Sequence, residues 1–288
     1  MKEITGHTGL TALIGTPVAH SISPQMHNEA FRQLGLDYVY LAFDIAPDDL
    51  TEAVDGLKKI GIRGFNVTMP HKTAVAELVD ELTPVAKIAG ACNTVINEGG
   101  HLIGHTTDGI GFWDAAKDAG YDLTQKTVTI LGCGGAATAI CAQGALDGIP
   151  KIHIMNRSGG SSYAKAQAFA KKVTDLSDCS VDVLPLEDGG ALRGAIAESD
   201  ILINATNVGM APDTDGCLIP DTSYFHPDLI VADIIYNPRE TKLLKMAKEA
   251  GCAAFNGMYM LLFQGAASFK CWTGQDMPVE IIRNKYFL

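Results

Sequence analysis

Residues 128–137 read Val-Thr-Ile-Leu-Gly-Cys-Gly-Gly-Ala-Ala, an apolar and partly β-branched run that ends in a Gly-x-Gly-x-x-Ala turn. A helix-forming stretch, residues 138–145, follows directly. In a dinucleotide-binding βαβ unit, Gly132 makes the tight turn, Gly134 lets the backbone approach a pyrophosphate, and Ala137 keeps helix and strand close. The free N–H groups at the helix start attract phosphate. The stretch therefore predicts a nucleotide-binding unit, and a glycine-rich turn that binds nothing is the alternative.

Length, charge and cysteine content narrow the class of protein. The chain has 288 residues, a net charge of −11 and seven scattered cysteines. Its length suits one large domain or two medium ones, and its acidity without a Lys/Arg cluster argues against a nucleic-acid partner. The cysteines form no C-x-x-C pair or zinc spacing, which is typical of reduced thiols in the cytosol. No run approaches the about 18 apolar residues of a membrane span, and residues 1–7 lack the apolar core of a signal peptide. We therefore expect a soluble, cytoplasmic α/β protein.

Strand-like and helix-like patterns alternate along the chain, which predicts parallel sheet covered by helices. In the first part we expect strands at residues 10–14, 38–43, 64–67, 93–97 and 101–104, the last two joined by a hairpin turn, and helices at 25–34 and 47–60. After the glycine turn we expect strands at 151–155, 181–184, 201–205, 229–235 and 253–255, and helices at 163–174, 191–198 and 240–250. This second series predicts a doubly wound sheet of about six strands.

The expected fold is therefore α/β with two lobes. Residues 1–107 form an N-terminal α/β substrate lobe, completed by the C-terminal segment 258–288, which is too short to be a domain. Residues 108–257 form a Rossmann-type nucleotide-binding domain. A cleft between lobes is the default place for a ligand.

The second strand of the nucleotide unit ends in Asn156-Arg157-Ser158-Gly159-Gly160-Ser161. NAD-binding units carry an acid near this point for the ribose 2′-hydroxyl, and none is present here. Arg157 can instead face a 2′-phosphate with its planar guanidinium, which favours NADP. Alternatively it stacks on the adenine, which either cofactor allows.

Two further pairs of residues are candidates for chemistry. Lys72 follows a predicted strand end, and Asp108 lies near the predicted lobe junction. A lysine beside a carboxylate in a desolvated cleft can donate and accept a proton, but spacing alone favours a surface lysine and a turn aspartate. Ser21 and Ser23 precede a predicted helix, where one is an N-cap or both face one ligand.

Other chemistries find less support in the sequence. The chain has no Tyr-x-x-x-Lys pair, and no Ser-His-Asp or paired-carboxylate arrangement stands out. His101 and His105 have metal-ligand spacing only on a helix, and strands are expected there, so we expect no metal. Because the sequence predicts a dinucleotide-binding unit and shows no other catalytic motif, hydride transfer is the leading chemistry.

Short motifs recur in a fixed order over nearly the whole chain. They are Ser21-x-Ser23, Asn66-Val67-Thr68-x-Pro70-x-Lys72, Gly90-Ala91-Cys92-Asn93-Thr94, Thr107-Asp108-Gly109, the glycine turn, Tyr236-Asn237-Pro238, and Gly257 followed by Gln264-Gly265. Together they resemble the shikimate dehydrogenase family, including its quinate/shikimate branch. The resemblance implies reversible, NADP- or NAD-dependent reduction of 3-dehydroshikimate to shikimate, in the pathway to chorismate and the aromatic amino acids.

The same resemblance implies roles for single residues. Lys72 moves the proton, and Asp108 orients it and balances its charge. Ser21 and Ser23 bind the substrate carboxylate, and the ring hydroxyls are held by Thr68, Asn93, Asp108, Tyr236 and Gln264. The cofactor is held by Gly132, Cys133, Gly134, Gly135 and Ala136 at the pyrophosphate, by Asn156, Arg157, Ser158 and Ser161 at the adenosine, and by Ile234 and Gly257, the latter near the nicotinamide.

Departures from the family pattern bear on specificity. Thr106 stands where many members have Asn, and Ser161 replaces a second basic residue of NADP-selective members. Gly159 and Gly160 replace an acid that is common in quinate-accepting members, whereas the tail at residues 272–278 resembles that branch. We expect NADP to be the preferred cofactor. The alternative function is quinate catabolism with NAD. A non-catalytic ligand sensor is a remoter alternative, because the chain retains the Lys–Asp pair. A homodimer is a further expectation.

Overall fold

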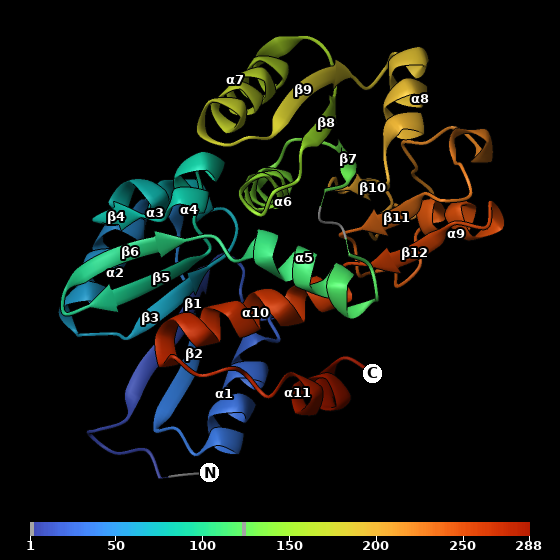
Figure 1. The fold of residues 1–288 in the computed structure, drawn as a ribbon. Helices are drawn as coiled ribbons and strands as arrows, with labels where there is room; N and C mark the ends of the chain where they lie inside the picture. Colours follow the sequence, from blue (N-terminus) through green and yellow to red (C-terminus); the bar gives the residue numbers. More distant parts are fainter. Residues whose placement is uncertain (1–2, 123–124) are drawn as a thin grey trace. The chain divides into compact units, whose positions relative to one another are not determined.

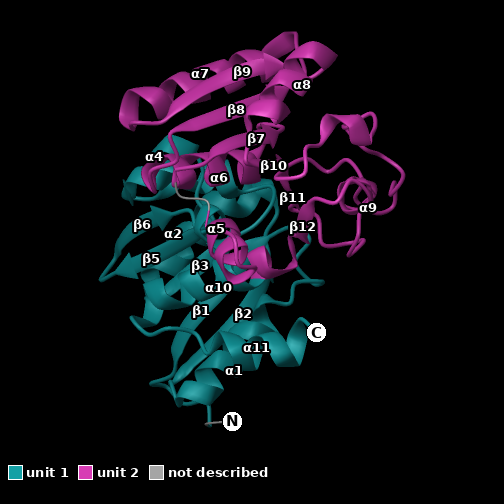
Figure 2. Cartoon of the chain, turned by 45° about the vertical axis from the view of Figure 1, so that its right-hand side comes forward, with its two compact units in different colours: residues 1–111, 262–288 teal, residues 112–261 magenta. Residues whose placement is uncertain are grey.

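The computed structural model describes residues 3–122 and 125–288, and the chain divides into two compact units. Unit 1 comprises residues 1–111 and 262–288, and unit 2 comprises residues 112–261 (Figure 2). The predicted lobe boundaries coincide with the first residues of α5 (Asp108–Asp118) and α10 (Met258–Thr273). The units divide about one turn further along each of these helices.

Unit 1 is built on a mixed six-stranded sheet with the order β2-β1-β3-β5-β6-β4 (Figure 1). Its strands are β1 (Gly9–Gly15), β2 (Tyr38–Asp44), β3 (Gly64–Val67), β4 (Glu81–Leu82), β5 (Thr94–Glu98) and β6 (His101–His105). β1 pairs in parallel with β2 and β3, whereas β5 is antiparallel to β3 and to β6. The predicted hairpin is thus β5–β6, and it makes this sheet mixed rather than wholly parallel.

Unit 1 has more helices than the sequence periodicity predicted, since α3 (Lys72–Leu78) and α4 (Pro84–Ala89) were not expected. Its other helices are α1 (Ser23–Leu34), η1 (Pro47–Asp49), α2 (Leu50–Lys59) and α11 (Val279–Tyr286), with the first turn of α5 and most of α10. The helix predicted at residues 47–60 begins as a 3₁₀ turn, η1, and continues as α2. The core contains buried Ile14, Phe65 and Val95 from neighbouring strands, together with Leu50 and Val54 of α2.

Helix α10 packs closely on the sheet and on α1 of unit 1, because a glycine lies at each of the two contacts. Trp272 is fully buried, and its indole N–H donates to the Val95 carbonyl at 3.0 Å. A Cβ on Gly64 would overlap that indole, and a Cβ on Gly265 would overlap Met26 of α1. The absence of both side chains therefore lets α10 come close to its neighbours.

Unit 2 contains a wholly parallel sheet with the order β12-β11-β10-β7-β8-β9. Its strands are β7 (Thr127–Leu131), β8 (Lys151–Asn156), β9 (Ser180–Pro185), β10 (Ile201–Asn204), β11 (Ile230–Asp233) and β12 (Ala253–Asn256). The first three run outward from β7 in one direction and the last three in the other, which is the doubly wound order. The predicted α/β fold with a Rossmann-type unit is confirmed.

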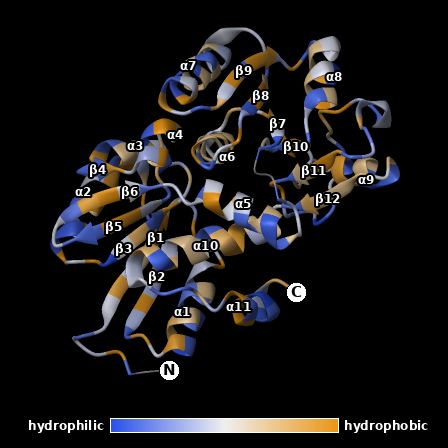
Figure 3. Cartoon of the chain, in the orientation of Figure 1, coloured by the Kyte–Doolittle hydropathy of each residue, from blue (hydrophilic) through white to orange (hydrophobic). Residues whose placement is uncertain are grey.

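The helices of unit 2 are α6 (Gly135–Leu146), α7 (Gly160–Leu176), α8 (Gly189–Glu198), η2 (Thr222–Tyr224) and α9 (Lys242–Glu249). They lie close to the predicted ranges, except that the sequence did not predict η2 or the part of α5 that belongs to this unit, from residue 112 onward. Figure 3 shows hydrophilic and hydrophobic residues mixed along α7, whose buried Ala166, Phe169, Ala170 and Val173 recur at helical spacing. Among the described helices, none is long and apolar enough to span a membrane.

Candidate active site

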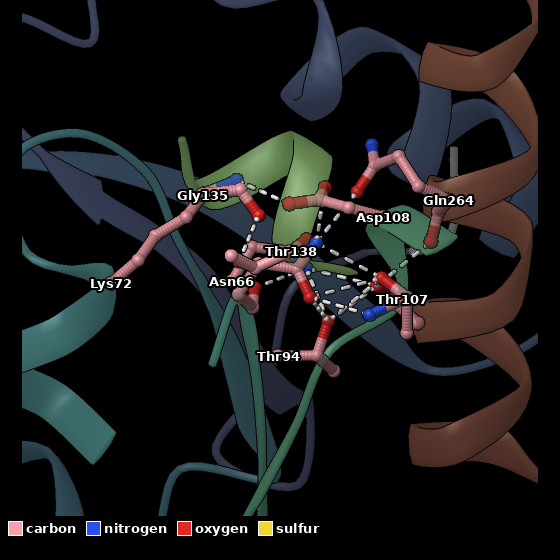
Figure 4. Close-up of polar contacts among 10 residues, drawn as sticks. Asn66, Lys72, Thr94, Thr107, Asp108, Gly135, Thr138 and Gln264 are labelled. Carbon is pink, nitrogen blue, oxygen red and sulfur yellow. Dashed lines mark hydrogen bonds and ion pairs between the residues drawn. The ribbon is translucent and has the colours of Figure 1, made fainter. Parts of the chain in front are cut away.

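Lys72 and Asp108 form an ion pair, although 36 residues separate them in the sequence. Each is the first residue of a helix, α3 and α5 respectively, and Lys72 Nζ lies 2.5 Å from Asp108 Oδ2 (Figure 4). The lysine side chain is 27% exposed and the aspartate side chain 10%. The pair is therefore sheltered yet reachable, and a carboxylate at the start of α5 also suits the positive end of that helix.

Asn93 holds the second oxygen of the aspartate. Its Nδ2 donates to Asp108 Oδ1 at 2.8 Å, and its Oδ1 accepts the Thr107 backbone N–H at 2.7 Å. The same Nδ2 lies 3.4 Å from Gln264 Oε1 on α10. Both carboxylate oxygens of Asp108 thus have a fixed partner, and four predicted site residues, Lys72, Asp108, Asn93 and Gln264, come together in unit 1.

A fully buried polar network lies next to Asn93 and extends from β3 to α10. Asn66 Nδ2 donates to Thr94 Oγ1 at 3.1 Å (Figure 4). The same Nδ2 donates to Ser268 Oγ at 2.9 Å, and the Ser268 and Thr94 hydroxyls lie 2.8 Å apart. The Tyr40 hydroxyl donates to Asn66 Oδ1 at 2.8 Å. Burial raises the pKa of Tyr40 well above its ordinary value, so this phenol stays a neutral donor.

Sequence reasoning did not assign this network to the site. One signal was available: Asn66 interrupts the apolar strand Gly-Phe-Asn-Val, and a polar side chain inside a buried strand needs partners. Ser268 gave no comparable signal, because it lies 202 residues from Asn66 on a helix whose sequence is apolar on most sides.

Ser21, Ser23 and Thr68 lie at the same edge of the unit 1 sheet as Lys72. The two serines follow β1 and Thr68 follows β3, and these strands are parallel neighbours, so their carboxyl ends meet at one edge. Neither serine is the N-cap of α1, because that residue is Ile22. The Ser21 hydroxyl instead accepts the Ser23 N–H at 3.2 Å.

The glycine turn of unit 2 has room for an anion. Gly132 has φ +93°, and a Cβ there would lie 2.7 Å from Thr206 Cγ2, so no other residue fits without a shift. The next helix, α6, begins at Gly135 with Gly134 as its N-cap, no capping side chain and no acid in its first turn. A Cβ on Gly134 or Gly135 would meet nothing within 4 Å, which leaves space beside the backbone amides. These features fit a pyrophosphate held by the amides up to Ala136.

Cys133 lies within this turn and is half-buried. Burial raises the pKa of its thiol to about 11. It is therefore a neutral thiol near neutral pH, which adds no negative charge beside a phosphate.

The segment expected at the adenosine follows β8. Asn156 is buried and its Nδ2 donates to the Ser162 carbonyl at 3.2 Å, whereas Arg157, Ser158 and Ser161 are exposed. Two glycines with positive φ, +81° at Gly159 and +76° at Gly160, lead into α7. Exposed donors on a glycine-rich turn fit the ribose end of a dinucleotide.

Ile234, Tyr236 and Gly257 lie at or beyond the ends of β11 and β12 in unit 2. A Cβ on Gly257 would overlap the carbonyl of Ile234, so this glycine is needed for close backbone approach. The buried carboxylate of Asp233 accepts the Ile235 N–H at 3.0 Å and the Thr241 hydroxyl at 2.7 Å, and sequence reasoning missed this support. Tyr236 is 50% exposed and belongs to unit 2, unlike the other predicted substrate residues.

The two histidines with metal-like spacing lie on β6, as expected. His105 Nδ1 lies 3.1 Å from the Thr83 hydroxyl, and burial lowers the pKa of this histidine. In the described parts of the chain, no group of three or more His, Cys, Asp or Glu side chains is arranged to hold a metal ion.

Three family models match the chain: the shikimate dehydrogenase substrate binding domain at residues 13–95, shikimate / quinate 5-dehydrogenase at 114–212, and the shikimate 5′-dehydrogenase C-terminal domain at 257–285. The shikimate dehydrogenase (NADP(+)) of Listeria monocytogenes serotype 4b is 48% identical over 286 residues, which are 99% of this chain and 98% of the relative. The quinate/shikimate dehydrogenase of Escherichia coli O17:K52:H18 is 45% identical over 281 residues, 98% and 97% of the two chains.

Among solved structures, the shikimate 5-dehydrogenase of Listeria monocytogenes in complex with shikimate and NAD matches with a TM-score of 0.95. It is 48% identical, and the match covers 99% of this chain and 98% of that one. The doubly wound nucleotide unit and the similarity to these dehydrogenases over the whole chain define an NAD(P)-dependent oxidoreductase that acts on a CH–OH group. The chain belongs to the shikimate dehydrogenase family, whose reaction interconverts 3-dehydroshikimate and shikimate.

Proposed function

We propose that Lys72 is the proton-transfer residue of this reaction and that Asp108 positions it. In the reductive direction, the Lys72 ammonium donates a proton to the oxygen of the substrate carbonyl as that carbon is reduced, and in the oxidative direction the amine accepts it. The cofactor supplies the hydride in one direction and accepts it in the other. The observation that carries this proposal is the 2.5 Å contact between Lys72 Nζ and Asp108 Oδ2, with Asn93 fixing the other oxygen.

The surrounding polar residues suit a small polyhydroxylated acid. Ser21 and Ser23 present hydroxyls for the substrate carboxylate, and the ring hydroxyls are held by Thr68, Asn93, Asp108, Tyr236 and Gln264. A site with several fixed donors and acceptors rejects analogues that lack the matching hydroxyls, because its own polar groups then lose their partners. Unit 1 is accordingly the substrate unit.

Unit 2 is the cofactor unit in this proposal. The turn from Gly132 to Ala136 holds the pyrophosphate, residues 156–161 hold the adenosine, and Ile234 and Gly257 line the nicotinamide end. Arg157 favours NADP through its guanidinium. A cytoplasmic location and a homodimer complete the proposal, the former supported by seven cysteines without a disulfide pattern.

Oxidation of quinate with NAD is the second candidate. The 45% identity with a quinate/shikimate dehydrogenase favours it, as does the absence of a second basic residue at Ser161. Quinate has a saturated ring with an extra hydroxyl, so a comparison of kcat/KM for the two acids separates the candidates.

The Lys72→Ala variant tests the proposed role of the lysine. We expect kcat with shikimate to fall by about 10²–10⁴, the usual contribution of a positioned proton-transfer group, while KM for shikimate changes little. Lys59→Ala is the matched control, because Lys59 is a lysine of unit 1 whose side chain is 73% exposed. Near-normal turnover of Lys72→Ala would remove Lys72 from the mechanism.

A further inference from the structure

The turn after β9 brings an acid to the segment that follows β8. Glu187 Oε1 and Oε2 accept the backbone N–H of Ser158 at 3.2 and 3.0 Å. The two strand ends are joined beside it, because Asn156 is the register partner of Pro185 and the Leu186 N–H donates to the Asn156 carbonyl at 2.9 Å. Glu187 is therefore held at the very segment that lacks an acid of its own.

The charges around this carboxylate bear on a 2′-phosphate. The Ser158 N–H and, less strongly, the Arg157 cation hold the pKa of Glu187 below its usual value, so the side chain is ionised near neutral pH. The Ser158 backbone N–H already donates to Glu187, and the Glu187 carboxylate offsets part of the attraction of Arg157 for a phosphate.

We propose that Glu187 determines cofactor specificity by opposing the 2′-phosphate of NADP and accepting the ribose 2′-hydroxyl of NAD. This inference rests on the proposed function of residues 156–161 as the adenosine site. In dinucleotide-binding folds an acid at the end of the second strand does this work. Here the carboxylate comes from the turn after the third strand of unit 2, 29 residues further along the chain than Ser158. The sequence motif places the acid at the end of the second strand, so it does not predict Glu187.

Arg157 and Glu187 have opposite electrostatic effects on the binding of NADP. A phosphate placed beside the guanidinium is attracted to Arg157 and repelled by Glu187, so the two contributions oppose each other. A ribose hydroxyl carries no charge and gains an acceptor. Use of both cofactors by one enzyme follows from this opposition.

Glu187→Gln tests the inference, because the amide keeps an acceptor for the Ser158 N–H and removes the charge. We expect kcat/KM for NADP with shikimate to rise about tenfold and kcat/KM for NAD to fall by a few-fold, and the change to shrink at high ionic strength. Glu249→Gln, which removes an exposed acid of unit 2 from α9, is the matched control and leaves the ratio unchanged.

Binding of cofactor fragments gives a readout that does not depend on turnover. We expect 2′,5′-ADP to bind Glu187→Gln about tenfold more tightly than the wild type by calorimetry, and 5′-AMP, which has the free 2′-hydroxyl of NAD, to bind this variant a few-fold more weakly. If Arg157→Ala weakens 2′,5′-ADP but Glu187→Gln changes neither probe nor the kinetic ratio, the role of Glu187 is overturned while the adenosine site stands. If neither variant has any effect, the assignment of residues 156–161 fails as well.

Discussion

Asp108 shows how single hydrogen bonds define the candidate site. One of its oxygens contacts Lys72, and the other accepts a hydrogen bond from the side-chain amide of Asn93. The side-chain oxygen of Asn93 in turn accepts the Thr107 backbone N–H. A carboxylate held at both oxygens has little freedom to rotate, so the lysine amine is held in one place as well. In the proposed mechanism, such positioning keeps the proton donor within reach of its acceptor.

His27 is a buried titratable residue of the same unit that takes no part in the proposed chemistry. Its ring stacks on Tyr40 with centroids 4.4 Å apart, and within the described chain neither ring nitrogen has a hydrogen-bond partner. Complete burial lowers its pKa to about 3. The folded protein therefore keeps His27 neutral.

This burial predicts a pH dependence of stability. The unfolded chain binds a proton at His27 near the ordinary pKa of 6.5, whereas the folded chain binds it only near pH 3. Between these values acidification favours unfolding, by up to about 1.4 kcal/mol per pH unit from this residue. In His27→Phe we expect the free energy of unfolding, measured with denaturant, to fall less steeply between pH 6.5 and 4.5.

His20→Gln serves as the control, because His20 is exposed and its loss leaves the slope unchanged. Direct observation by NMR is independent of any folding defect in the variant. A His27 ring resonance that titrates near pH 6.5 in the folded wild type would contradict the account.

At the scale of elements, glycines decide which helices and strands can touch. Gly64 on β3 leaves space for the Trp272 ring of α10, and a Cβ there would also lie 2.5 Å from the Val95 carbonyl oxygen. The rigid indole and the backbone of a central strand cannot both move away. Gly56 in the middle of α2 makes a natural contrast, because a Cβ at that position would meet nothing within 4 Å.

Two alanine substitutions should therefore have opposite effects. We expect Gly64→Ala to lower the free energy of unfolding by about 1–3 kcal/mol, through overpacking against Trp272. We expect Gly56→Ala to raise it by about 0.5–1 kcal/mol, because alanine is the better helix former. Denaturant unfolding followed by Trp fluorescence measures both, and equal effects would contradict the packing described for α10.

The elements also show what periodicity can predict. The strands of unit 2 are short apolar runs between glycine turns and helices, so five of them, from β8 to β12, match the predicted ranges within about two residues. Helix α5 was missed because its sequence, Asp-Gly-Ile-Gly-Phe-Trp-Asp-Ala-Ala-Lys-Asp, has two glycines among its first four residues. Helix α3 and strand β4 were missed because they are too short to show a period.

At the scale of the whole molecule, the candidate site residues were predicted from the family pattern rather than from physical reasoning on the sequence. Spacing left Lys72 and Asp108 as a surface lysine and a turn aspartate, because nothing local shows that the first residues of two helices meet. The contacts from Asn66 to Ser268 join residues 202 positions apart and depend on α10 packing on unit 1. Such long-range pairs are fixed by the fold and have no local signature.

Steady-state absorbance at about 340 nm with shikimate or quinate, each with NADP or NAD, tests the central claim most directly. The account predicts that shikimate has the highest kcat/KM, and that NADP and NAD both support its oxidation because Arg157 and Glu187 oppose each other at the ribose. Quinate with NAD ahead of shikimate would favour the quinate branch. Absence of turnover with shikimate and either cofactor would contradict the account.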